Sequence, residues 1–129
     1  MNLAARLEKL RPHVLSLLRI VVALLILQSG LEKFFGFPAA GPPLRGLEIP
    51  AAAIETIGGL LLLVGVFSRW AALVISGEMA FAYFLAHAPK SFYPAVNGGN
   101  LAVLYCFVFL YLVFAGPGPW SIDRAMKRE

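Results

Sequence analysis

Three ionisable residues interrupt long apolar runs and are the first candidates for chemistry: Arg19, Glu55 and Glu78. A charged side chain at the centre of a bilayer costs about 2.5–3.5 kcal/mol on insertion scales, so such residues face the protein interior and find partners there. Counted from the same membrane side, Arg19 and Glu78 differ in depth by about 6 Å, which an arginine side chain can span. We therefore expect a buried Arg19–Glu78 ion pair, which either fixes helix register or serves a functional site.

Glu55 is the first candidate for a carboxyl group that exchanges protons or anchors a ligand. It shares a helix face with Gly58 and Gly59, and small residues on such a face let a neighbouring helix approach closely. Asn100 begins another apolar run at the same membrane side, so we expect a Glu55–Asn100 hydrogen bond, with Lys33 as a second candidate partner. The alternative is that Glu55 is only a hydrogen-bonded clamp between helices.

A second polar group lies at the outer end of the third and fourth apolar runs. His87 follows Tyr83 by one helical turn, and Asn97-Gly98-Gly99-Asn100 precedes the fourth run. The histidine is either a solvated interface residue or a group that exchanges protons with outside water. Asn97 either caps the fourth helix, with glycine permitting the turn, or belongs to a ligand site. The candidate ligand or proton site therefore contains Glu55, Asn100, Asn97, Tyr83 and His87.

The remaining residue types exclude several familiar cofactor sites. A bis-histidine haem needs two histidines at one depth, but His13 and His87 lie at opposite membrane sides, about 30 Å apart. Cys106 is the single cysteine, so the chain lacks the cysteine pair of a thiol oxidoreductase. No histidine and cysteine cluster suits zinc or an iron–sulfur centre. We expect no metal and no intrinsic cofactor, so any redox-active group would be a diffusible quinone or belong to a partner.

The composition identifies the elements that must position these residues. Of the 129 residues, 60% are hydrophobic and 14% are charged, whereas soluble domains are about 45–50% apolar and about 25% charged. The mean hydropathy is +0.79, so much of the surface must face a lipid bilayer. Each apolar run lacks the alternation of a barrel strand and is predicted to cross the membrane as a helix. We predict an all-α, four-transmembrane-helix bundle in a single domain (residues 1–129), with spans at about 14–35, 49–67, 70–88 and 100–115.

Charged residues beside the apolar runs predict the orientation. The net charge of +4 reflects these flanking residues and not a nucleic-acid-binding patch. An N-terminal signal peptide is the alternative for the first run, but that run is long and three more follow. More basic residues flank the side of both termini, so we predict cytoplasmic N and C termini: Arg6, Lys9, Arg11, Arg69, Arg124, Lys127 and Arg128, against Lys33, Arg45 and Lys90.

Several segments resemble the DoxX family of small bacterial membrane proteins, in order over nearly the whole chain: Ser29–Gly36, Glu55–Leu62, Gly65–Arg69, Met79–Phe84, His87–Pro89, Asn97–Tyr105 and Gly116–Asp123. The resemblance implies a four-helix bundle in the bacterial cytoplasmic (inner) membrane. It also implies association with a membrane quinol oxidase or thiosulfate:quinone oxidoreductase, or with redox or thiol stress. Relatives often carry glutamate where this chain has Asn100, so a role that needs a carboxylate there does not carry over.

Three functions fit these observations. The first, which we favour, is an accessory subunit or quinone- and quinol-binding component of a membrane redox system, with Glu55 supplying a protonatable group. The second is a non-catalytic membrane scaffold or assembly factor that recruits a membrane or soluble redox partner protein. The third is a small transporter, which would require a homo-oligomer because four short helices leave little room for a pore. The sequence does not decide whether the protein is an enzyme.

Overall fold

The computed structural model describes residues 2–39 and 41–128, and these residues form helices and connecting loops with no β-strand. The prediction of an all-α fold is therefore confirmed. The elements in chain order are α1 (Leu3–Phe35), α2 (Glu48–Val64), α3 (Ser68–Ala82), the π-helical turn η1 (Tyr83–His87), α4 (Pro94–Asn97), α5 (Asn100–Ala115) and α6 (Ile122–Ala125).

Backbone signals set the helix ends where hydropathy alone does not. The Asn2 side chain accepts a hydrogen bond from Ala5 N at 2.9 Å, so α1 begins within the polar N-terminal segment and continues through Pro12. Helix α2 ends before Gly65, whose left-handed conformation (φ 77°) lets its N–H and that of Val66 reach the Leu61 carbonyl. The second helix is therefore shorter than the predicted span 49–67.

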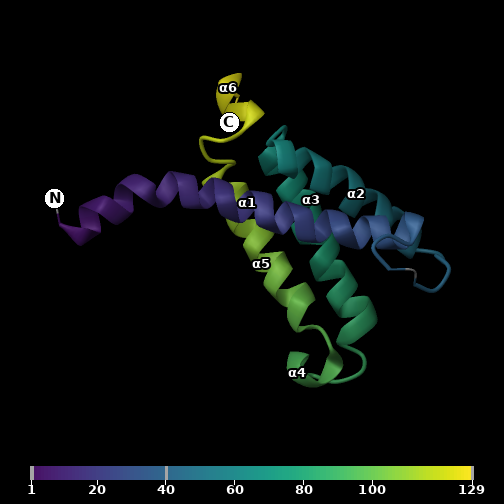
Figure 1. Cartoon of the computed structure of the whole chain (residues 1–129). Coiled ribbons are helices and arrows are strands. Elements are labelled where there is room, and N and C mark those ends of the chain that lie inside the picture. Colours follow the sequence, from purple (N-terminus) through teal and green to yellow (C-terminus); the bar gives the residue numbers. More distant parts are fainter. Residues whose placement is uncertain (1, 40, 129) are drawn as a thin grey trace.

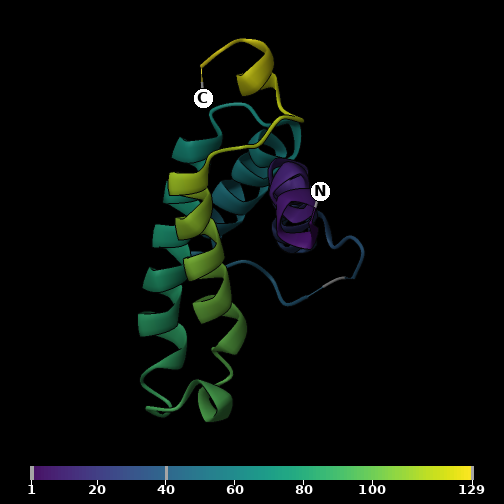
Figure 2. The same ribbon diagram turned by 90° about the vertical axis from the view of Figure 1, so that its left-hand side faces the viewer.

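The helices associate as two antiparallel pairs that cross one another. Helix α1 packs along α2, and α3 packs along α5, while contacts between α2 and α3 join the pairs. Figure 1 and Figure 2 show the α1–α2 pair crossing the α3–α5 pair steeply, so the helices do not all run side by side. The N-terminal part of α1 extends beyond the other helices, and α4 lies at the opposite end of the α3–α5 pair from α6.

The core lies where the pairs cross and is built from small and branched side chains. Ala23, Ile26, Leu62, Ile75 and Phe109 are fully buried at this crossing. Large hydrophobic side chains also cover much of the outer surface of the described helices, as expected for a surface in contact with lipid. Two helical stretches, Leu3–Phe35 and Ser68–His87, are long and apolar enough to cross a membrane. Helices α2 and α5 are shorter, with 17 and 16 residues.

Candidate functional site

A buried carboxylate on α2 is held by two side chains of α1. Glu55 is 1% exposed. The Lys33 ammonium donates to both of its carboxylate oxygens, at 2.9 Å and 2.8 Å, and the Ser29 hydroxyl donates to one at 2.6 Å. The second candidate partner of Glu55, Lys33, is therefore confirmed. The described residues contain no Glu55–Asn100 hydrogen bond, and Asn100 is exposed at the start of α5, so that prediction is wrong.

Close contact between α1 and α2 explains why these side chains meet. Gly30 lies directly against α2, because a Cβ atom placed there would be 2.7 Å from the Thr56 nitrogen. From the other helix, a Cβ atom at Gly59 would lie 3.0 Å from the Leu27 Cα. Real Cβ atoms essentially never approach backbone as closely as 2.7 Å, so the packing requires Gly30, and a side chain at Gly59 would force a small shift of α1. The short separation brings Ser29 and, one turn later, Lys33 within hydrogen-bonding reach of Glu55.

A second buried carboxyl group faces this cluster from α3. Glu78 interacts with Glu55, and both of its carboxyl oxygens are buried without a hydrogen-bond partner among the described residues. Tyr105 of α5 also lies within electrostatic range of Glu55. We name Ser29, Lys33, Glu55 and Glu78 the carboxyl cluster. The sequence singled out both glutamates, but it did not predict that they face one another.

Arg19 does not pair with Glu78, so the predicted ion pair is wrong. Arg19 is 1% exposed, and its guanidinium donates to the Pro117 carbonyl and, at 2.7 Å, to the Trp120 carbonyl. Ser16, one turn earlier on α1, donates to the Pro117 carbonyl at 3.2 Å and accepts from Trp120 N at 3.1 Å. Arg19 therefore anchors the segment after α5 onto α1.

Asp123 ties the same C-terminal segment to the start of α3. Its carboxylate accepts hydrogen bonds from Phe67 N at 3.0 Å and Ser68 N at 2.9 Å, and Asp123 N donates to the Gly65 carbonyl at 2.8 Å. Burial alone would raise the pKa of Asp123, but the Ser68 and Phe67 amides and the Arg128 guanidinium outweigh burial and hold the pKa below its usual value.

The sequence reasoning missed this C-terminal anchor, although signals for it were present. Two prolines after α5 cannot continue the helix, so they leave a non-helical segment with carbonyls available to donors. Asp123 is the chain's single aspartate and follows Ser121, which caps the short helix α6 by accepting from Arg124 N at 3.1 Å. Arg69 completes the anchor by donating to the Val113 and Phe114 carbonyls at 2.7 and 2.8 Å.

The predicted polar group at the outer end of the third and fourth runs does form a cluster. Asn97 donates to the Tyr83 hydroxyl at 3.2 Å and to the Ser91 carbonyl at 2.9 Å, while its own side-chain oxygen accepts from Gly99 N at 2.8 Å. His87 Nδ1 lies 3.2 Å from the Asn97 carbonyl oxygen. These contacts order the turn into α5, and none of them reaches Glu55 within the part of the chain that the structure describes.

Two grooves lie elsewhere on the molecule. One, of about 540 Å³, is bounded by α1, the end of α5 and the segment after it. The other, of about 330 Å³, lies between α2 and α3 and is lined by apolar groups. Glu55 lines neither groove. Among the described residues, no three histidine, cysteine, aspartate or glutamate side chains gather closely enough to hold a metal ion.

Comparison with known proteins places the chain among small membrane proteins. Residues 14–88 match the DoxX protein family. An uncharacterized protein of Haemophilus influenzae is 44% identical, over 95% of this chain and 98% of its own length. An uncharacterized membrane protein of Mycobacterium tuberculosis is 25% identical, over 87% of this chain and 80% of its own length. The inner membrane protein YqjF of Escherichia coli is 28% identical, over 86% of this chain and 90% of its own length. No solved structure matches the chain at a significant level.

Proposed function

The chain belongs to the DoxX family of membrane proteins, and we propose that it serves a membrane redox system as a quinone-binding or accessory component. The observation that carries this proposal is the buried carboxyl cluster, in which the Glu78 carboxyl group lies next to Glu55 and has no hydrogen-bond partner in residues 2–39 and 41–128. Reduction or oxidation of a quinone transfers protons together with electrons, and a site for it needs a protonatable group at a defined position. The cluster provides that group within the helices.

Charge balance in the cluster favours one retained proton. Lys33 supplies one positive charge, whereas two carboxyl groups could supply two negative charges. Two carboxylates at one poorly solvated site repel strongly, so such pairs hold a proton between them. Glu55 is already hydrogen-bonded to Lys33 and Ser29, so we place the proton on Glu78. The Lys33 side chain is 33% exposed, which gives the cluster a route for proton exchange with the surface.

The same proposal includes four membrane crossings with both termini in the cytoplasm. Helices α2 and α5 measure about 25 Å at 1.5 Å per residue, near the lower limit for a span of about 30 Å.

Thiol labelling of intact cells tests this topology in a Cys106→Ser background. Gly41→Cys should react with an impermeant reagent from outside, whereas Lys127→Cys should react only after permeabilisation. The reverse pattern, or reaction of both from outside, would contradict the topology.

Infrared difference spectroscopy of the full-length protein in detergent tests the proton site. Wild-type protein should show the carbonyl stretch of a protonated carboxyl group at neutral pH, and Glu78→Gln should lose it. Glu48→Gln is the matched control, because Glu48 is exposed at the start of α2 and should leave the band unchanged. Absence of the band in wild-type protein would overturn the proton site.

Binding of a short-chain quinone analogue, followed by titration calorimetry, tests the redox assignment separately. We expect Glu55→Gln and Glu78→Gln each to weaken binding of the analogue about tenfold, because each removes one hydrogen bond to a charged or buried partner. Glu48→Gln should bind the analogue as tightly as wild-type protein. If wild-type protein has the carboxyl band but does not bind the analogue, the proton site stands and the quinone assignment fails.

A scaffold function is the second candidate, and a separate observation favours it. The groove of about 330 Å³ between α2 and α3 has a wholly apolar lining that includes Ile57, Trp70 and Val74. An apolar groove of this kind suits a transmembrane helix of a redox partner protein. Affinity purification from native membranes distinguishes the candidates: a stoichiometric partner that stays bound to Glu55→Gln but is lost from Val74→Trp would favour the scaffold.

A further inference from the structure

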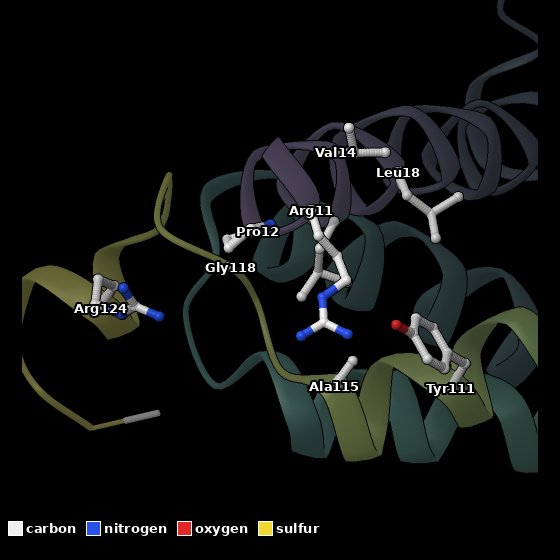
Figure 3. A pocket seen from close by; sticks show the side chains of 9 residues that line it. Arg11, Pro12, Val14, Leu18, Tyr111, Ala115, Gly118 and Arg124 are labelled. Atoms are coloured by element: carbon white, nitrogen blue, oxygen red, sulfur yellow. The ribbon is translucent and has the colours of Figure 1, made fainter. Parts of the chain in front are cut away.

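The groove of about 540 Å³ combines apolar walls with cationic groups at its mouth (Figure 3). Val14, Leu15 and Leu18 of α1 form the apolar side. Figure 3 shows the Arg11 guanidinium and the Tyr111 hydroxyl pointing toward one another across the groove. Its size lies within the range of about 300–1,000 Å³ that small-molecule sites occupy.

The charges around the groove suit an anion. Two arginines, Arg11 and Arg124, belong to its lining, and none of the described residues that line it is acidic. Arg11 pairs with Glu8 at 3.3 Å, but both side chains are largely exposed, and an exposed pair of this kind contributes little. Guanidinium groups present several donors in a planar fork that matches the oxygens of a phosphate.

The N-terminal part of α1 supplies an independent sign of contact with a membrane surface. At 33 residues, α1 measures about 50 Å, so it exceeds the hydrocarbon core of about 30 Å. Its free end, which projects past the other helices in Figure 1, carries exposed apolar side chains three and four residues apart: Leu3, Leu7, Leu10, Val14 and Leu17. Helical periodicity places Arg6 and Arg11 on either side of this stripe. Such a helix lies in the interface between lipid and water.

An aromatic contact indicates that the groove lies at the same membrane depth as the N-terminal part of α1, at the interface between lipid and water. The ring of His13, two residues after Arg11, lies 5.3 Å from the Trp120 ring in the segment that closes the groove. Trp120 is half exposed, and tryptophan is enriched where a membrane surface meets water. The cationic mouth of the groove therefore lies at headgroup depth, with its apolar wall continuing along α1.

We propose that this groove binds an anionic phospholipid. The lipid phosphate binds between the Arg11 guanidinium and the Tyr111 hydroxyl, which both donate to it, and Arg124 adds positive charge on the other side of Arg11. The upper part of the acyl chains follows Leu15 and Leu18. Basic pockets between membrane helices on the cytoplasmic side recognise anionic headgroups in this manner. This site is separate from the carboxyl cluster, and it stands whether or not that cluster handles protons.

Native mass spectrometry of the full-length protein in detergent tests the site. The protein is titrated with phosphatidylglycerol, with phosphatidylcholine of the same acyl chains, and with inorganic phosphate. Wild-type protein should retain one phosphatidylglycerol at least tenfold more tightly than phosphatidylcholine. Arg11→Gln with Arg124→Gln should reduce phosphatidylglycerol binding by about tenfold or more, since each basic residue contributes to headgroup attraction.

The control removes the same charge from positions outside the groove. Arg6→Gln with Lys127→Gln should bind phosphatidylglycerol within about threefold of wild type, because only diffuse attraction is lost. Equal losses in the two double variants would overturn the site, as would equal wild-type binding of the two lipids. Inorganic phosphate that competes at concentrations near those of the lipid would show a free-phosphate site and would overturn the lipid assignment. The wild-type comparison of the two lipids decides the matter even if a variant does not fold.

Discussion

Replacing Asp123 with alanine removes the carboxylate that joins the C-terminal segment to the start of α3. Its hydrogen bonds from Phe67 N and Ser68 N satisfy amides at the beginning of that helix. Loss of a helix cap costs about 1 kcal/mol, and a buried amide left without an acceptor costs about 1–3 kcal/mol. The ion pair with Arg128 adds little to the free energy of unfolding, because the Arg128 side chain is partly exposed. We therefore expect Asp123→Ala to lower the free energy of unfolding by about 3 kcal/mol.

The same residue predicts a pH dependence. The folded-state pKa of Asp123 is held below its usual value, because the hydrogen-bond donors around it outweigh burial. A carboxyl group shifted in this direction stabilises the fold above its unfolded pKa of about 3.9. That contribution is lost as the pH falls through the lower folded-state pKa. Wild-type protein should therefore lose stability below about pH 4, and Asp123→Ala should lack this component.

Equilibrium unfolding in mixed detergent micelles measures both effects. Asp123→Asn keeps one acceptor oxygen and should fall between wild type and Asp123→Ala. Glu8→Ala is the matched control, because Glu8 is an exposed carboxylate on α1 and its loss should change stability by less than about 0.5 kcal/mol. If Asp123→Ala unfolds within about 0.5 kcal/mol of wild type at pH 7, the C-terminal segment does not stabilise α3 as we argue.

Three further predictions concern the helix contacts. Gly30→Ala should destabilise the protein by about 2 kcal/mol in the same assay, because its Cβ would lie 2.7 Å from an α2 nitrogen. Gly77→Ala, which meets no atom within 4 Å, should be neutral or stabilising, so equal effects would contradict the argument. Lys33→Met should cost about 2–3 kcal/mol by leaving the buried Glu55 carboxylate without its cation, and adding Glu55→Gln should recover most of this loss; no recovery would exclude their coupling. Arg19→Met should speed tryptic cleavage of the C-terminal segment, measured by mass spectrometry, and an unchanged rate would refute its anchoring role.

The apolar helices could be predicted because each is a continuous hydrophobic run, and lipid leaves the backbone few alternatives. The start of α5 matches its run at Asn100. Helix ends shifted where a local backbone signal acts, as at Gly65, which stops α2 early. The steep crossing of the two helix pairs could not be predicted, because it depends on which faces carry small residues on four helices at once.

Partners of the buried charges could be predicted only in part. The Lys33–Glu55 contact follows from two residues that lie at the same end of helices adjacent in sequence. The predicted partner of Arg19 was wrong because the acceptors of its guanidinium are backbone carbonyls outside any helix and not a carboxylate on a neighbouring helix. A guanidinium group only donates hydrogen bonds, and it can donate to backbone carbonyls as well as to carboxylates. The proline-containing segment after α5 lies outside any helix and offers carbonyls to Arg19. Depth counting along helices cannot detect such a segment.

The anchoring of Arg19 constrains how the chain is made. Its acceptor at Pro117 lies 98 residues further along, so the first helix is synthesised long before that carbonyl exists. Until the segment after α5 is made, the Arg19 guanidinium lacks the two carbonyls that accept its hydrogen bonds in the folded protein. A chain that ended before Pro117 would carry a charged side chain on α1 without these acceptors, and an apolar environment penalises such a charge strongly.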